Sequence, residues 1–182
     1  PTPTNTPVPP TPTPIPDGIF CSTAPVAIPD PGTTNSIINV ADGRTISDLN
    51  VSINASHTWV GDLTFTLSHN GVSVAVIDRP GVPASTYGCS GADINATLDD
   101  EAGAPVENQC AAGAPTINGT FTPNVSLTGF DGQAVNGSWT MTVSDAVGAD
   151  SGTLNQWCLV ATLGGIVPTP TNTPVPPTPT NT

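Results

Sequence analysis

The side chains of this 182-residue chain that could do chemistry are mostly carboxylates. Asp and Glu together number 14, and eight of them lie at or near the ends of predicted strands and loops: Asp62, Asp78, Asp93, Asp99, Asp100, Glu101, Asp145 and Asp150. Calcium takes about six to eight oxygen ligands, several of them from carboxylates that converge from different loops. These acids are therefore candidate Ca²⁺ ligands. The alternative is that they are solvated surface charges or caps of turns.

Residues suited to catalysis are few. His57 and His69 are the two histidines, and neither lies near a subtilisin-like nucleophile motif or at a spacing that would complete a zinc site. His69 lies beside a predicted turn, where we expect it to be solvated. Asp99, Asp100 and Glu101 are adjacent in sequence, so they do not form two carboxyl groups across a glycosidic bond. The sequence predicts a protein that is not an enzyme.

Charge and hydropathy exclude several classes of function. The formal net charge is -12, with Arg44 and Arg79 as the basic residues. A nucleic-acid binder needs a cationic face and a polybasic membrane anchor needs clustered Lys or Arg, so we expect neither. No apolar run approaches the roughly 20 residues that span a bilayer. The chain has neither an initiator Met nor a signal peptide, so we expect a mature product or a piece of something longer.

Composition divides the chain into three segments. Residues 1–16 and 168–182 are Pro/Thr-rich linkers without charged, aromatic or Gly residues, whereas residues 17–167 carry every acid, Cys and aromatic side chain. The middle segment has about the length of one ordinary domain. Both linkers contain the same text, PTPTNTPVPPTPT, at residues 1–13 and 168–180. Such text favours extended polyproline II, a semi-rigid rod.

The linkers admit two compatible interpretations. The first is a spacer between domains. The second is a scaffold for O-linked glycans, because Pro-flanked Thr is held extended and exposed. The candidate acceptors are Thr2, Thr4, Thr6, Thr11, Thr13, Thr169, Thr171, Thr173, Thr178 and Thr180.

Short runs of alternating apolar and polar residues predict that the middle segment is all β. The stronger runs are 49–53, 63–67, 72–76, 139–143 and 157–163, and the weaker ones are 37–40, 94–98 and 117–121. Thr, Ser and Asn at the alternate positions suit a solvated sheet face. About eight short antiparallel strands in one domain predict a β-sandwich, of jelly-roll type.

The four cysteines favour disulfides over a metal site because none of them forms a CxxC pair. Three connectivities are open. We favour Cys21–Cys158, which would join the start of the domain to its last strand, and Cys89–Cys110, which would close a loop rich in Gly and Asp. Disulfides predict an oxidising compartment, either extracellular or at the cell surface.

Four stretches of the middle segment form an ordered set. They read HTWVGDL at 57–63, TLDDEA at 97–102, FDGQAVNGSWTMTVSD at 130–145 and DSGTLNQWCL at 150–159. Together, over roughly 45–163, they resemble the P domain (P/Homo B domain) of the subtilisin-like proprotein convertases. The resemblance implies a jelly-roll β-sandwich that supports the folding and stability of a protease without being the enzyme. It also implies a structural role for His57.

The resemblance narrows the choice of metal ligands. Asp62, Asp99, Asp100 and Asp145 lie inside the matching motifs, and they are our candidate ligands for Ca²⁺ as a cofactor. Trp59, Trp139 and Trp157 also lie in these motifs. They could stack on sugar rings, although Trp is more often a core residue. Asn-x-Ser/Thr triplets, the acceptor signal for N-glycans in eukaryotic secreted proteins, begin at Asn50, Asn54, Asn95, Asn118, Asn124 and Asn136.

Our leading hypothesis is a non-catalytic extracellular structural module, one unit of a surface stalk, adhesin or fibre. The first alternative is an accessory domain of a secreted subtilisin-like protease, and the second is a carbohydrate-binding module. The expected partners are neighbouring domains of a longer chain or other copies of the same chain, with glycans as a further class. Because the chain begins and ends in the same Pro-Thr text, a tandem array or a head-to-tail filament is also expected.

Overall fold

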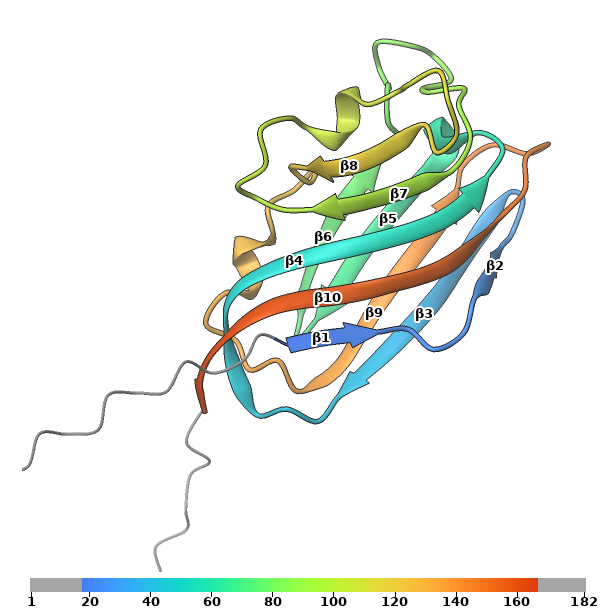
Figure 1. Cartoon of the computed structure of the whole chain (residues 1–182). Coiled ribbons are helices and arrows are strands. Elements are labelled where there is room, and N and C mark those ends of the chain that lie inside the picture. Colours follow the sequence, from blue (N-terminus) through green and yellow to red (C-terminus); the bar gives the residue numbers. More distant parts are fainter. Residues whose placement is uncertain (1–17, 167–182) are drawn as a thin grey trace, which may run out of the picture.

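The computed structural model describes residues 18–166, which form strands joined by loops and short 3-10 turns (Figure 1). The Pro/Thr-rich linkers and the ten threonines proposed as glycan acceptors lie outside these residues. The described part of the chain contains no helix of the length and apolar character needed to cross a membrane.

Two sheets pack face to face, which confirms the predicted β-sandwich. The six-stranded sheet has the order β1-β10-β4-β7-β8, and β2 also pairs with β10. Its strands are β1 (Gly18–Cys21), β2 (Val26–Ile28), β4 (Arg44–His57), β7 (Ile94–Leu98), β8 (Ile117–Phe121) and β10 (Gly152–Ile166). The four-stranded sheet, in the order β3-β9-β5-β6, contains β3 (Gly32–Val40), β5 (Leu63–His69), β6 (Val72–Asp78) and β9 (Gly137–Asp145). The 3-10 turns are η1 (Val60–Asp62), η2 (Val106–Asn108) and η3 (Leu127–Phe130).

Side-chain alternation produces both the strands and the core. In β5 every odd residue from Leu63 to His69 is buried and every even one is partly exposed. The apolar faces of the two sheets meet in one core, in which Trp139 and Trp157 are fully buried. These two rings therefore cannot serve as a sugar-stacking platform. His69, which we expected to be solvated, is also buried, because its ring stacks on Trp139 at a centroid distance of 3.8 Å.

The pairing of β7 with β8 departs from the antiparallel expectation. These strands run parallel, in a register that sets Asn95 beside Asn118, whereas the ladder between β4 and β7 is antiparallel. The ladder between β4 and β10 is the longest in the molecule and carries a bulge between Leu154 and Gln156. The irregularity places consecutive side chains of β10 on its solvated face.

The structure contains both of the favoured disulfides. Cys21–Cys158 links β1 to the neighbouring strand β10 and joins residues 137 apart in sequence. Cys89–Cys110 joins the loop after β6 to the segment after η2, across 21 residues. The described cysteines are therefore all paired.

Candidate functional site

Three of the four resemblance motifs meet at one end of the sandwich, which we call the motif end (residues 57–62, 79–91 and 145–152). β4 ends there at His57, β5 begins after η1, β9 ends at Asp145 and β10 begins at Gly152. The register sets Leu63 opposite Asp145 and His57 opposite Gly152. Motifs that are separated by about 90 residues in sequence are thus neighbours in space.

A buried contact between a histidine and an aspartate forms the base of the motif end. His57 Nε2 lies 3.1 Å from Asp145 Oδ2, and both side chains are fully buried. The other ring nitrogen, Nδ1, lies 3.2 Å from the backbone N–H of Trp59 and 2.9 Å from its carbonyl oxygen. Asp145 also accepts a hydrogen bond from the backbone N–H of Val147. With both ring nitrogens engaged and no solvent access, His57 is positioned to hold the loops rather than to exchange protons with a substrate.

Asp62 lies beside this pair, and Arg79 offsets part of the destabilisation of its charged form. Burial raises the pKa of Asp62 above its ordinary value and Asp145 raises it further, whereas Arg79 lowers it. Arg79 reaches Asp62 Oδ1 at 3.5 Å and donates to the Gly61 carbonyl at 3.3 Å. The long contact to Asp62 means that the carboxylate is only partly neutralised.

Close backbone packing brings the Tyr87 loop onto the motif end. Gly61 N–H donates to the Cys89 carbonyl at 2.9 Å, and a Cβ on Gly61 would lie 2.4 Å from the Cys89 nitrogen. The indole N–H of Trp59 donates to the Tyr87 carbonyl at 2.7 Å. The Cys89–Cys110 disulfide fixes the same loop from its other side. Together these contacts hold Tyr87 over Trp59.

The result is a small surface cavity, which we call the rim pocket. It is lined by Trp59, Asp62, Tyr87, Val147 and Asp150, and its volume is about 250 Å³. Tyr87 is 63% exposed and Val147 is 36% exposed, so apolar side chains face solvent above a rigid base. An apolar rim with two carboxylates suits contact with an apolar and basic surface of another domain.

The structure separates the four proposed calcium ligands into two pairs. Asp62 and Asp145 lie together at the motif end. Asp99 and Asp100 follow Leu98, whose partner on β4 is Val51, six residues before His57. Six residues of extended strand span roughly 20 Å, so the two pairs cannot share one cation.

Asp99 and Asp100 have local structural partners. Asp99 accepts the backbone N–H of Glu101, as in an Asx turn. Asp100 accepts the backbone N–H groups of Leu127 and Thr128, which start η3. Both residues therefore satisfy backbone donors, the alternative that the sequence left open for the loop-end acids.

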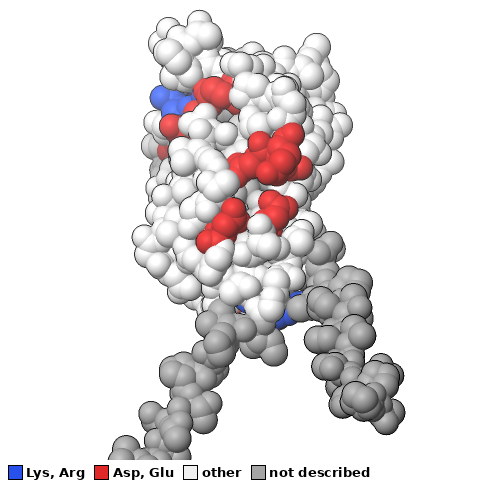
Figure 2. All heavy atoms as spheres, turned by 90° about the vertical axis from the view of Figure 1, so that its left-hand side faces the viewer, with Lys and Arg blue, Asp and Glu red and all other residues white. Residues whose placement is uncertain are grey.

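An acidic patch surrounds this second pair at the other end of the sandwich. Figure 2 shows the carboxylates gathered on this side of the molecule. A hydrogen bond with Asp99 raises the pKa of Glu101, and burial raises the pKa of Asp131, with further repulsion from Asp48 and Asp100. Within residues 18–166 no cluster of three or more His, Cys, Asp or Glu side chains has the geometry to hold a metal ion. Calcium binding therefore stays a prediction, now for two separate pairs.

Sequence reasoning found part of the motif end. Trp59, Asp62 and Asp145 stand in the quoted motifs, but Arg79, Tyr87 and Val147 lie in loops without a periodic or compositional signal. The pairing of Cys89 with Cys110 was the one clue that the Tyr87 loop is held against the sandwich.

Two curated proteases resemble most of this chain. A transglutaminase-activating metalloprotease from Streptomyces mobaraensis is 28% identical over 143 residues, which are 78% of this chain and 14% of that protein. A calcium-dependent protease from Nostoc sp. is 26% identical over 145 residues, which are 78% of this chain and 18% of that protein. The chain therefore spans less than a fifth of the length of either relative.

Among solved structures, the chain aligns with a serine protease of Aeromonas sobria. In its complex with a chaperone, the TM-score is 0.47 at 17% identity, over 83% of this chain and 27% of the other. In the structure of the protease alone, the TM-score is 0.45 at 16% identity, over 84% and 28% of the two chains.

The match to a family model is more specific. Residues 107–161 match the model of the proprotein convertase P-domain. The matched range contains β9, β10 and the loop between them, and this segment supplies Asp145, Val147 and Asp150 to the motif end. The resemblance to proprotein convertase P-domains that the motifs implied is therefore confirmed, with these residues as the matched segment.

Proposed function

We propose that this chain is a non-catalytic accessory domain of a secreted protease and that it docks on the catalytic domain through the motif end. The observation that carries the proposal is the P-domain match over residues 107–161. Two relatives with protease names, of which the chain spans 14% and 18%, support the same role. Two disulfides support folding in an extracellular compartment.

The motif end suits docking for physical reasons. Its base is rigid, because the buried His57–Asp145 pair and the Cys89–Cys110 disulfide hold the loops. Its rim exposes Tyr87 and Val147, and burying these side chains against a partner would stabilise the complex. Tyr is also a residue type that contributes strongly at interfaces. The partner is expected to be the catalytic domain of the same chain.

The test uses the complete protein that contains this domain. Tyr87→Ala combined with Val147→Ser should shorten the half-life of proteolytic activity at raised temperature, while the melting temperature of the isolated domain stays unchanged. Ile19→Ser is the matched control, because Ile19 is 67% exposed on β1, away from the motif end. A complete coding sequence without a protease domain, or equal half-lives for both variants, would remove the proposal.

A structural module in a stalk or fibre is the second candidate function. It is favoured by the identical text at residues 1–13 and 168–180, which would let copies follow one another in a tandem array. Electron microscopy and mass measurement of the native material distinguish the two functions. Filaments or repeated domains, with mass beyond the polypeptide, support the stalk and its O-glycans. Monomers of the bare polypeptide mass contradict both the stalk and the O-glycans.

A further inference from the structure

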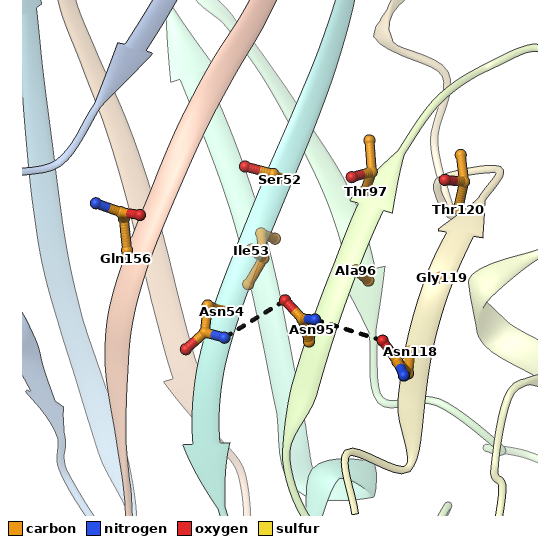
Figure 3. Close-up of a pocket in the computed structure, with 10 residues that line it drawn as sticks. All are labelled: Ser52, Ile53, Asn54, Asn95, Ala96, Thr97, Asn118, Gly119, Thr120 and Gln156. Atoms are coloured by element: carbon orange, nitrogen blue, oxygen red, sulfur yellow. Dashed lines mark hydrogen bonds between the residues drawn. The ribbon is translucent and has the colours of Figure 1, made fainter.

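A larger cavity lies away from the motif end, on the outer face of the six-stranded sheet. Its volume is about 450 Å³, and it lies over β10, β4, β7 and β8 (Figure 3). We call it the sheet hollow and define it by six side chains: Ser52, Asn54, Asn95, Thr97, Asn118 and Thr120. Neither function proposed above uses this face, although Asn54, Asn95 and Asn118 each begin an Asn-x-Ser/Thr triplet.

Strand register builds the sheet hollow as two rows of like side chains. Asn54 pairs with Asn95 and Asn95 with Asn118, which forms a row of three amides across three strands. Ser52, Thr97 and Thr120 form the neighbouring row of hydroxyl groups by the same ladders. Residues two apart on a strand share a face, so both rows point to solvent. With strands about 4.8 Å apart, each row spans roughly 10 Å.

The bulge on β10 extends the hollow by one strand. The register shift between Leu154 and Gln156 leaves Asn155 partly exposed and Gln156 exposed, on the solvated face of the sheet. Asn155 donates to Asn54 Oδ1 at 2.9 Å and so orients that amide. Gln156 pairs with Asn54 in the ladder and lines the hollow (Figure 3). Bulges commonly turn a side chain in this way at functional sites.

The amides of the row retain hydrogen-bonding capacity. Asn54 donates to Asn95 and Asn95 donates to Asn118, both at 3.4 Å, which is long for a hydrogen bond (Figure 3). An amide side chain has two N–H donors and two acceptor lone pairs, so these contacts occupy only part of each group. The hydroxyl row adds groups that both donate and accept. The hollow thus offers donors and acceptors side by side.

The chemistry of the lining selects the class of ligand. No charged and no aromatic residue lines the sheet hollow. A phosphate or carboxylate ligand would therefore find no cationic side chain in the hollow, and a metal ion would find no carboxylate. A lipid would find little apolar surface. A neutral polyol needs alternating donors and acceptors, and the volume lies in the range of small-ligand sites.

We propose that the sheet hollow binds a neutral oligosaccharide along the amide row, with Asn95 at its centre. Hydroxyl groups of the sugar would replace the long contacts between amides and would bond to Gln156 and to the hydroxyl row. Because no aromatic ring is available for stacking, the affinity is weak, with a Kd of about 1 mM. Weak binding of this kind suits a domain that keeps an attached or neighbouring protein close to a polysaccharide surface, where many copies act together.

The test is an NMR titration of the complete 182-residue chain, purified without N-linked glycans and labelled with ¹⁵N. The probes are neutral hexasaccharides of β-1,4-glucose, β-1,4-xylose and α-1,4-glucose, each raised to about 10 mM, ten times the expected Kd. We expect at least one of them to shift the side-chain amide signals of Asn54, Asn95, Asn118 and Gln156. Signals of the motif end should stay in place.

Substitutions assign the binding to the hollow. Asn95→Ala should weaken the affinity by about fivefold or more, because it removes the central donor and acceptor. Asn124→Ala is the control, since Asn124 is exposed but does not line the hollow, and it should bind like the unaltered chain. The proposal is overturned by an absence of shifts with all three probes, by shifts that map elsewhere, or by equal affinity in Asn95→Ala. Preferential shifts with the synthetic peptide PTPTNTPVPPTPT would overturn it in favour of capture of the linkers.

Discussion

At the residue scale, burial decides what each ionisable side chain does. His57 was a candidate for catalysis by type alone, yet its ring is buried, bonded to Asp145 on one side and to Trp59 on the other. A catalytic base must reach a proton on a substrate, and this ring is closed to solvent. The pair instead links the end of β4 to the end of β9. The residue type alone made His57 a candidate for catalysis, whereas its buried surroundings give it a structural role.

The first prediction concerns this pair. His57→Ala should lower the free energy of unfolding by about 3–5 kcal/mol, because it leaves the buried Asp145 without its partner. Urea denaturation at neutral pH measures the change. Asn39→Ala, an exposed position on β3, is the control and should change stability by less than about 0.5 kcal/mol. If the isolated chain hydrolysed a peptide or a glycoside, and His57→Ala abolished this hydrolysis without lowering stability, the structural role would be contradicted.

The second prediction concerns Asp62. Burial, with Asp145 as a further cause, raises its pKa in the folded state above the ordinary value of 3.8. The folded protein therefore favours the protonated form, and this contribution to stability is lost as the pH rises through the folded pKa. Asp62→Asn removes the ionisation. The stability of the variant relative to the unaltered chain should increase between about pH 3 and pH 7, as urea denaturation across that range would measure. A difference in stability between the two proteins that stays constant with pH would contradict the raised pKa of Asp62.

At the element scale, two glycines inside the motifs allow close backbone packing at the motif end. Gly61 lets η1 pack on the Cys89 backbone, and Gly152 lets the first residue of β10 pass His57, where a Cβ would lie 2.2 Å from the Ser56 carbonyl oxygen. Alternation of apolar and polar residues predicted most strands, although β1 and β2 are too short to show a period. The bulge of β10 and the parallel pairing of β7 depend on neighbouring strands, so no local sequence pattern predicts them.

The third prediction tests the packing at Gly61. Gly61→Ala should destabilise the domain by at least about 1–3 kcal/mol, because the added methyl group meets backbone atoms that cannot rotate away. Gly103→Ala is the matched control, since a Cβ there meets no atom within 4 Å. Thermal and urea unfolding of the two variants provide the comparison. Equal stabilities would mean that the loop relaxes and does not hold the motif end.

The fourth prediction concerns the Cys89–Cys110 disulfide. Replacing both cysteines by Ala should cost about 3 kcal/mol, the chain-entropy value for a loop of this size. It should also free the Tyr87 loop and expose Trp59, whose indole N–H donates to the Tyr87 carbonyl. Fluorescence should then shift to longer wavelength while Trp139 and Trp157 stay buried. Unchanged emission with reduced stability would show that the disulfide stabilises the fold without positioning the loop.

At the scale of the whole molecule, the sequence was informative about architecture and less so about the sites. The motifs predicted the family resemblance that residues 107–161 confirm. The calcium hypothesis gathered four acids on the assumption that loop ends meet, but a sandwich has two ends. Only the register of β7 on β4 assigns Asp99 and Asp145 to opposite ends. The sheet hollow likewise depends on pairing across strands that are distant in sequence.

The last prediction follows from the distribution of charge over the domain. Burial raises the pKa of Asp62, Glu107 and Asp131, and a hydrogen bond with Asp99 raises that of Glu101. Each of these groups stabilises the fold when protonated and loses that contribution as the pH rises through its folded pKa. Asp42 behaves in the opposite way, because its hydrogen bonds to Arg44 lower its pKa. Its contribution is lost only below the ordinary value of 3.8.

The carboxyl groups with raised pKa values and Asp42, whose pKa is lowered, together place the maximum of stability in mild acid. The free energy of unfolding should rise as the pH falls from 7 toward the ordinary carboxyl pKa values of 3.8 and 4.5, and it should decline again below 3.8, as Asp42 becomes protonated. Added salt should stabilise the domain at pH 7, where repulsion within a chain of net charge -12 is strongest, and should have less effect at pH 4. Melting curves over this pH range, at low and high salt, measure both effects. A maximum at neutral pH would mean that the raised carboxylates are compensated in the fold by contacts stronger than the 3.5 Å approach of Arg79 to Asp62.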